Sequence, residues 1–152
     1  MRYLKPGSKG LLVAGIVGAL LALAAAVPSR TTGAPPPASP SLVGRITSKS
    51  GPSNARVWAI TLSNGGSGTA NNAQIDSFSL SQTIGAACTP VVSSPATFPL
   101  AIGSIAPAGS ALGTLTIDFT GCPLNARFSV TILFSANAGA VTGSIVRYQS
   151  FQ

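Results

Sequence analysis

The chain of 152 residues contains no histidine, and its only acidic residues are Asp76 and Asp118. Without histidine the usual serine and cysteine catalytic triads are excluded, because an imidazole is their general base. Lys49, the remaining candidate base, is expected on a turn without a serine partner. Glycoside hydrolysis needs two facing carboxyl groups, whereas Asp118 is expected on an outer strand face and Asp76 at a β-bulge. Calcium sites usually use several carboxylates, so the sequence predicts no enzymatic activity, no cofactor and no metal site.

Charge of either sign is scarce: charged residues make up 7% of the sequence, and the formal net charge is +7. Three of the nine bases, Arg2, Lys5 and Lys9, precede the first apolar run. A nucleic-acid-binding face usually presents a basic patch or stripe, and the other bases are scattered along the sequence without a cluster. The sequence therefore predicts dispersed, solubilising charge and no nucleic-acid partner. The scattered bases are Arg30, Arg45, Lys49, Arg56, Arg127 and Arg147.

Residues 1–26 have the composition of a secretory signal peptide. The early bases are followed by the apolar run Gly10–Val27, in which Ala24-Ala25-Ala26 offers an A-x-A cleavage site. The same run is just long enough to span a membrane, so an uncleaved signal anchor is the alternative. Both alternatives export the rest of the chain. We therefore expect an extracellular or cell-envelope protein that contacts a membrane only if residues 10–27 remain attached.

Residues 27–40 read as a linker rich in proline, serine and alanine. The stretch Ser29–Pro40, SRTTGAPPPASP, has three consecutive prolines and small polar neighbours. Such a composition cannot pack a core and favours extended polyproline II conformation. We interpret it as a spacer; the alternative is a ligand for a protein that binds proline motifs.

From residue 41 to residue 152, short apolar runs alternate with turn residues, as in a β-sandwich. The sequence predicts one all-β domain of seven to eight antiparallel strands, preceded by a signal or anchor helix and the linker. A phase slip near Asp76-Ser77 indicates a bulge, Pro90 places its strand at an edge, and Asn64-Gly65-Gly66 favours a tight turn. The predicted strands are Leu42–Ser48, Arg56–Ser63, Ala73–Gln82, Cys88–Ser93, Phe98–Ile105, 113–120, 128–134 and Val141–Tyr148.

The stretch RVWAITLSNGGSG at Arg56–Gly68 predicts the centre of this domain. Its bulky residues alternate with smaller ones, which is the period of a strand with one buried face. Trp58 is the only tryptophan in the chain, and we expect it to fill the middle of the core. The predicted core residues are Trp58, Ile60, Leu62, Leu115, Ile117, Phe119, Phe128, Val130 and Ile132.

Three motifs give the domain a family resemblance. They are W-x-I-x-L-x-N-x-G-x-G at Trp58–Gly68, G-x-I-x-P-x-G at Gly103–Gly109 and F-x-G-C at Phe119–Cys122. In these motifs the chain resembles bacterial cell-surface immunoglobulin-like modules, most of all the CARDB-type group of cell-adhesion-related domains. The resemblance covers residues 41–152 and implies an immunoglobulin-like β-sandwich that spaces, displays or binds at the cell surface. Its motifs are turn and core residues, which specify a fold and carry no chemistry.

Cys88 and Cys122 are the only cysteines of the chain. An even count in an exported protein favours a disulfide, which we expect to join strand ends across the domain. The alternative is a reactive thiol or a metal ligand, but activating neighbours are missing from the sequence around both residues.

The remaining question is what the domain contacts. Most aromatic residues alternate in step with aliphatic ones and are expected in the core. Tyr148 and Phe151 escape that pattern, and we expect them either to cover the first strand or to form part of a contact surface. We therefore expect a non-catalytic structural or adhesion module with an unknown surface protein or glycan as partner. The alternative is an extracellular module that binds a protein or a carbohydrate.

Overall fold

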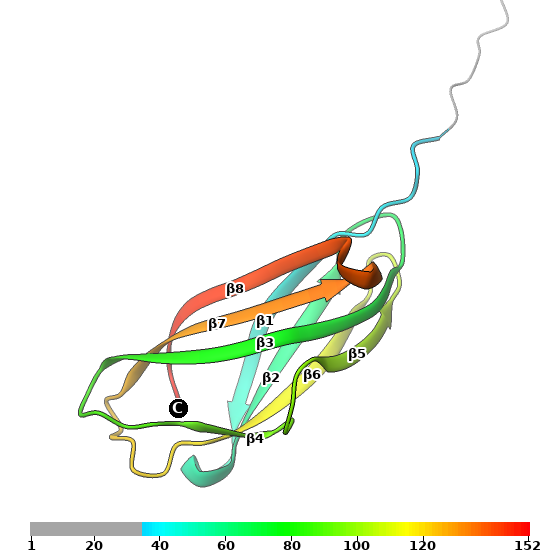
Figure 1. Ribbon diagram of the computed structural model, residues 1–152. Coiled ribbons are helices and arrows are strands. Elements are labelled where there is room, and N and C mark those ends of the chain that lie inside the picture. The colour runs from blue at the N-terminus through cyan, green and yellow to red at the C-terminus, as the bar shows by residue number, and fades with distance from the viewer. Residues whose placement is uncertain (1–34) are drawn as a thin grey trace, which may run out of the picture. The chain divides into compact units, whose positions relative to one another are not determined.

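Eight β-strands form two antiparallel four-stranded sheets in the computed structural model, which describes residues 35–152 (Figure 1). The predicted β-sandwich is therefore confirmed at the level of an all-β, two-sheet fold. The predicted signal or anchor segment and the first part of the predicted linker lie outside the described residues. Within residues 35–152, no helix is long and apolar enough to cross a membrane.

The first sheet has the strand order β1-β2-β6-β4, and the second has the order β5-β3-β7-β8. Two short 3-10 turns, η1 (Ser53–Ala55) and η2 (Asn137–Gly139), connect strands. The strands of the first sheet are β1 (Leu42–Ser50), β2 (Arg56–Asn64), β6 (Ser110–Asp118) and β4 (Val91–Ser94). Those of the second sheet are β5 (Leu100–Ile105), β3 (Ala70–Ile84), β7 (Arg127–Ala136) and β8 (Val141–Ser150).

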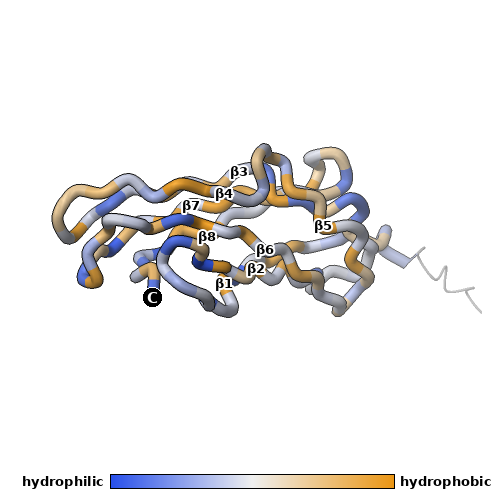
Figure 2. The backbone as a smooth tube through the Cα atoms, turned by 90° about the horizontal axis from the view of Figure 1, so that it is seen from below, coloured by the Kyte–Doolittle hydropathy of each residue, from blue (hydrophilic) through white to orange (hydrophobic). Residues whose placement is uncertain are grey.

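The core lies between the two sheets, and all the predicted core residues are buried in it. Trp58 is fully buried; its ring packs edge-on against Phe78 at 5.9 Å and stacks with Phe119 at 6.0 Å. Apolar residues recur along the strands of both sheets in Figure 2, because alternate side chains of a strand point to opposite faces. The period-2 pattern of the sequence thus determines which side chains face the core.

Two local features of the strands follow the prediction. The pairing of β3 with β7 shifts register between Ile75 and Ser77, which is the expected bulge at Asp76. Strand β4 is a four-residue edge strand, as expected beside Pro90. It begins at Val91 instead of Cys88, and β5 begins at Leu100 instead of Phe98, because a proline has no N–H to donate to a strand ladder.

The residues Asn64-Gly65-Gly66 do not form the expected tight turn with positive φ: neither glycine has a positive φ, and the loop passes from one sheet to the other without closing a hairpin. The glycines serve a close approach instead. A side-chain carbon on Gly66 would collide with the backbone around Ser39 and Pro40, and one on Gly68 would lie 2.8 Å from the carbonyl oxygen of Ala38. The last residues of the predicted linker therefore pack against this loop and belong to the folded domain.

Asn64 is the residue that joins these segments. Its side chain is 1% exposed, and its Nδ2 donates to the carbonyl oxygens of Gly68 at 2.7 Å and Ile105 at 3.0 Å. Its Oδ1 accepts hydrogen bonds from the backbone N–H groups of Ser41 and Gly66, both at 3.0 Å. One buried amide thus connects β1, the β2–β3 loop and the end of β5.

Candidate functional site

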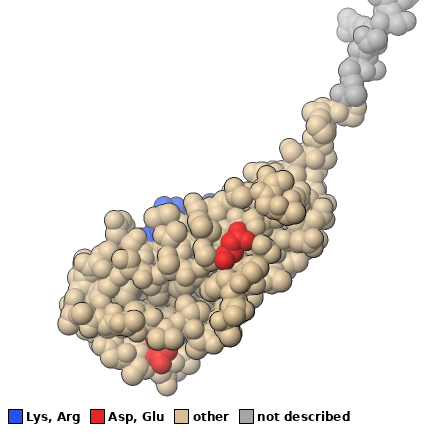
Figure 3. Space-filling model, viewed as in Figure 1, with Lys and Arg blue, Asp and Glu red and all other residues tan. Residues whose placement is uncertain are grey.

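The five basic residues within residues 35–152 gather along one side of the sandwich, where β1 ends the first sheet and β8 ends the second. The prediction of dispersed charge is therefore wrong for the folded domain: bases that are scattered in the sequence become neighbours in space. Figure 3 shows blue side chains at the β8 edge, while the red aspartates lie apart from each other and from that edge. We call the five residues the basic strip: Arg45, Lys49, Arg56, Arg127 and Arg147.

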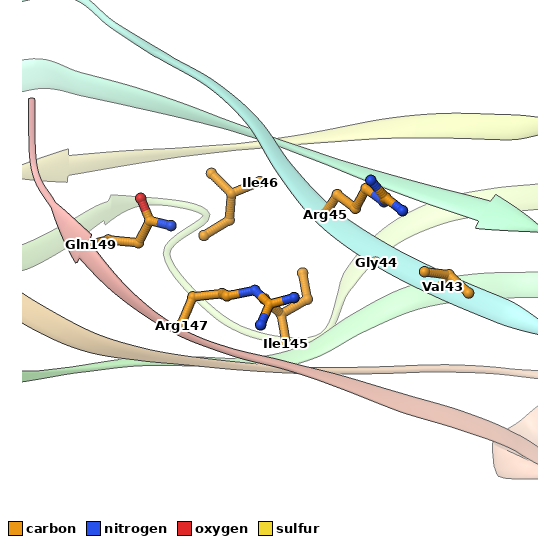
Figure 4. A pocket seen from close by; sticks show the side chains of 7 residues that line it. All are labelled: Val43, Gly44, Arg45, Ile46, Ile145, Arg147 and Gln149. Carbon is orange, nitrogen blue, oxygen red and sulfur yellow. The ribbon is translucent and has the colours of Figure 1, made fainter.

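A groove of about 330 Å³ runs between β1 and β8 at one end of this strip. Arg147 extends from β8 into the space between the two strands, as Figure 4 shows. Within residues 35–152, no side chain or carbonyl group accepts a hydrogen bond from Arg45 or Arg147, so both guanidinium groups can take an external ligand. The groove is lined by Val43, Gly44, Arg45, Ile46, Ile145, Arg147 and Gln149.

The alternation of β8 explains why a charged side chain lines this groove. Ile145, Arg147 and Gln149 share one phase of the strand; Ile145 is buried under β1, whereas Arg147 is exposed. Two glycines allow β1 and β8 to lie close to the Phe134 ring, near the end of the groove where Ile145 is buried. A side-chain carbon on Gly44 would lie 2.6 Å from the Phe134 ring, and one on Gly143 would collide with the same ring.

Lys49 connects the groove with the rest of the basic strip. It lies within β1, and not on a turn as predicted. Its Nζ donates to Gln149 Oε1 at 2.5 Å and to the Ser150 carbonyl, and it lies 4.6 Å from the centroid of the Trp58 ring. Burial, together with the nearby charges of Arg56 and Arg127, lowers the pKa of Lys49 to about 8. All the charged groups that shift this pKa are cations.

Arg56 continues the strip and holds the C-terminal segment. Its Nε donates to the Phe151 carbonyl at 2.9 Å, and its Nη1 donates to the Gly51 carbonyl. The Phe151 side chain is only 2% exposed and stacks on Phe119 at 4.8 Å. The prediction that Phe151 belongs to a contact surface is therefore wrong: it closes the core. Tyr148, in contrast, is 79% exposed on β8.

The two aspartates lie on different sheets. Asp76 on β3 accepts hydrogen bonds from Gln74 Nε2 at 2.7 Å and Ser135 Oγ at 2.9 Å. Asp118 on β6 accepts from the backbone N–H of Thr120 at 2.7 Å, and hydrogen bonding from Thr120 lowers the pKa of Asp118. Among the described residues, no three histidine, cysteine, aspartate or glutamate side chains are grouped so that they could hold a metal ion. Asp76 thus accepts hydrogen bonds from its own sheet, and Asp118 accepts one from the turn that follows β6.

The predicted disulfide between Cys88 and Cys122 is present. Cys88 precedes β4 and Cys122 follows β6, and these two strands pair with each other in the first sheet. The bond therefore joins the ends of neighbouring strands and does not reach across the domain as expected. It ties the short edge strand β4, which has few ladder bonds of its own, to the central strand β6.

Sequence analysis did not identify the basic strip, because its members come from four different strands. One feature of the sequence could have indicated the position of Arg147. It lies two residues after Ile145, so both side chains point to the same face of β8, which is the face that is buried at Ile145. Comparisons with family models, with curated proteins and with solved structures found no match for this chain.

Proposed function

We propose that this chain is a non-catalytic, exported β-sandwich module of the cell envelope or the extracellular space, and that it makes contact with an anionic partner through the basic strip. The observation that carries the proposal is the placement of all five domain cations along the β1 and β8 edges, with both aspartates elsewhere. Such an arrangement creates a one-sided positive field that attracts anionic partners.

We propose further that this sandwich is immunoglobulin-like, and the strand order supports that assignment. A constant-type immunoglobulin domain has strands A, B, E and D in one sheet and C, F and G in the other. Matching the strands in chain order gives β1-β2-β6-β4 as A-B-E-D and β3-β7-β8 as C-F-G. Strand β5 is additional, lying beside β3 although it follows β4 in the chain. Trp58 lies on β2, which is B, and the disulfide joins segments beside D and E, unlike in antibody domains.

The predicted export signal of residues 1–26 and the disulfide support a location outside the cytoplasm. Disulfides persist in oxidising compartments, and the Cys88–Cys122 bond ties down an edge strand. The resemblance to CARDB-type surface modules agrees with a contact role. The absence of histidine from the whole sequence and the separation of Asp76 from Asp118 argue against proton-transfer chemistry.

A second candidate function is binding of a protein or neutral carbohydrate on the outer face of the second sheet. Tyr148 and Val146 are exposed there, at 79% and 58%. A hollow of about 350 Å³ on the same sheet is lined in part by Asp76, Leu133 and Thr142. An exposed aromatic beside hydroxyl-bearing residues is a surface on which sugars or peptides can pack. Arg127 is the one cation that the described residues place in the outward phase of this sheet, so binding here should depend on salt far less than binding to the basic strip.

The experiment measures retention of the exported protein on cell-envelope fragments of the producing organism, by co-sedimentation at increasing salt. We expect binding that weakens with salt and is reduced in Arg45→Gln/Arg147→Gln. A matched control, Ser79→Glu/Thr114→Glu, makes the same change of two charge units on exposed outer-face positions and should bind like wild type.

Binding that varies little with salt and is lost in Tyr148→Ala would replace the first candidate with the second. A wild-type turnover in a hydrolase panel that disappears in Asp76→Ala/Asp118→Ala would contradict the non-catalytic assignment.

A further inference from the structure

We infer that the partner of the basic strip is a linear, acidic polysaccharide that lies along the β1/β8 groove. The inference rests on the proposed function and adds the chemical class of the partner. It follows from the length of the strip, from what lines it and from the way its two edge strands are protected.

The length of the strip indicates a polymer. On the first sheet, Arg45 of β1 lies opposite Thr61 of β2. Arg56, where the strip ends, is five residues from Thr61 on the same strand. At a rise of about 3.3 Å per residue this row of cations is about 17 Å long. On the second sheet, Arg147 pairs with Val130 and lies three positions, about 10 Å, from Arg127. One small anion cannot reach both ends, whereas a chain with one charge on each repeating unit can.

The lining of the groove argues against a nucleic acid. Its seven residues include no aromatic side chain, and proteins that hold single-stranded nucleic acids stack the bases on aromatic rings. The outer faces beside the strip carry mostly serine, threonine and aliphatic side chains, so a duplex would find few further phosphate contacts. Ile46, which is half-buried, can pack against the C–H face of a sugar, and the guanidinium groups can bind carboxylates in bidentate fashion.

The edge strands argue against an acidic peptide. An extended peptide usually binds a sheet edge by adding a strand to it. The pairing of β1 with β2 shifts register between Ile46 and Ser48, and both edges place a cation in the inward-facing phase, Lys49 on β1 and Arg147 on β8. Bulges and inward-pointing charges are the devices by which edge strands resist strand addition.

The test measures the affinity of the exported protein for four probes of similar length: polygalacturonate, dextran, polyglutamate and a deoxythymidine oligonucleotide. We expect polygalacturonate to bind most tightly and dextran not at all. Arg45→Gln/Arg147→Gln should weaken polygalacturonate binding about tenfold, because each exposed ion pair contributes modestly. The slope of log affinity against log salt should fall by about 1.5. The control Ser79→Glu/Thr114→Glu should keep the wild-type affinity and the wild-type salt slope. Equal urea midpoints will show that the variants are folded.

Preferred binding of polyglutamate or of the oligonucleotide would overturn the acidic polysaccharide. If the arginine-dependent retention on envelope fragments persisted in that case, the proposed function would stand. Equal affinity of the arginine variant and wild type for polygalacturonate would overturn the inference as well. If Arg45→Gln/Arg147→Gln matched wild type both in polygalacturonate binding and in retention on envelope fragments, the proposed function would be contradicted as well.

Discussion

Replacement of Asn64 by alanine should destabilise the domain more than any other polar substitution in it. The change removes four hydrogen bonds, of which the two to the carbonyl oxygens of Gly68 and Ile105 are buried. A buried polar group left without a partner costs about 1–3 kcal/mol. The two backbone N–H groups of Ser41 and Gly66 are part-buried, so water can replace part of the hydrogen bonding that they lose. The free energy of unfolding should therefore fall by about 3–4 kcal/mol, the sum of two buried losses near the middle of that range.

Urea unfolding with the disulfide intact measures this loss. With a urea m-value of about 1–1.5 kcal/mol per molar for a domain of this size, the midpoint should fall by about 2–4 M. Ser67→Ala is the matched control, because the Ser67 hydroxyl makes one exposed hydrogen bond to the same segment, and it should stay within about 0.5 kcal/mol of wild type. An Asn64→Ala protein as stable as the Ser67→Ala protein would refute the role of Asn64 as the connection between β1, β5 and the loop.

Three further predictions concern the core, the disulfide and Lys49. Trp58→Ala should cost about 3–5 kcal/mol in urea unfolding through lost burial and an unfilled cavity; red-shifted, readily quenched native fluorescence would show instead that Trp58 is exposed. Cys122→Ser should lower the free energy of unfolding by about 2–4 kcal/mol through loss of the loop constraint, and the native wild type should give no adduct with a thiol reagent; two labelled cysteines would contradict the bond. Because the folded protein lowers the pKa of Lys49 from 10.5 to about 8, the unfolded chain binds more protons between these values, so stability should rise from pH 8 to 10.5. Lys49→Met should flatten this rise, and an unchanged slope would contradict the burial of the ammonium group.

The sequence predicted the sheets well because period-2 alternation is a local property. Trp58, Ile117 and Phe128 each stand in a run whose alternate residues are apolar, and each is buried. The bulge at Asp76 was readable for the same reason, since a slip of phase is also local. The glycines after Asn64 were misread, because a turn and a close approach of two segments both favour glycine, and only the tertiary structure distinguishes them.

The candidate site could not be predicted in the same way. The basic strip depends on β1 and β8 meeting at the edge of the sandwich, which is a long-range outcome of topology. Phe151 was misplaced because it lies beyond the last strand, where no alternation extends, and its burial depends on Arg56 holding the backbone of its segment. Tyr148 was correctly expected outside the core, since it stands out of phase with Ile145 on β8.

Hydrogen–deuterium exchange in the presence of cell-envelope fragments tests the central claim most directly, because it maps the contact surface without any substitution. If the basic strip is that surface, protection should increase in β1 and in the second half of β8, which together carry Arg45, Lys49 and Arg147. Strand β6, on the face that carries Thr114, should exchange as in the free protein. Protection confined to β6 or to the β4–β5 side, with β1 and β8 unchanged, would contradict the account.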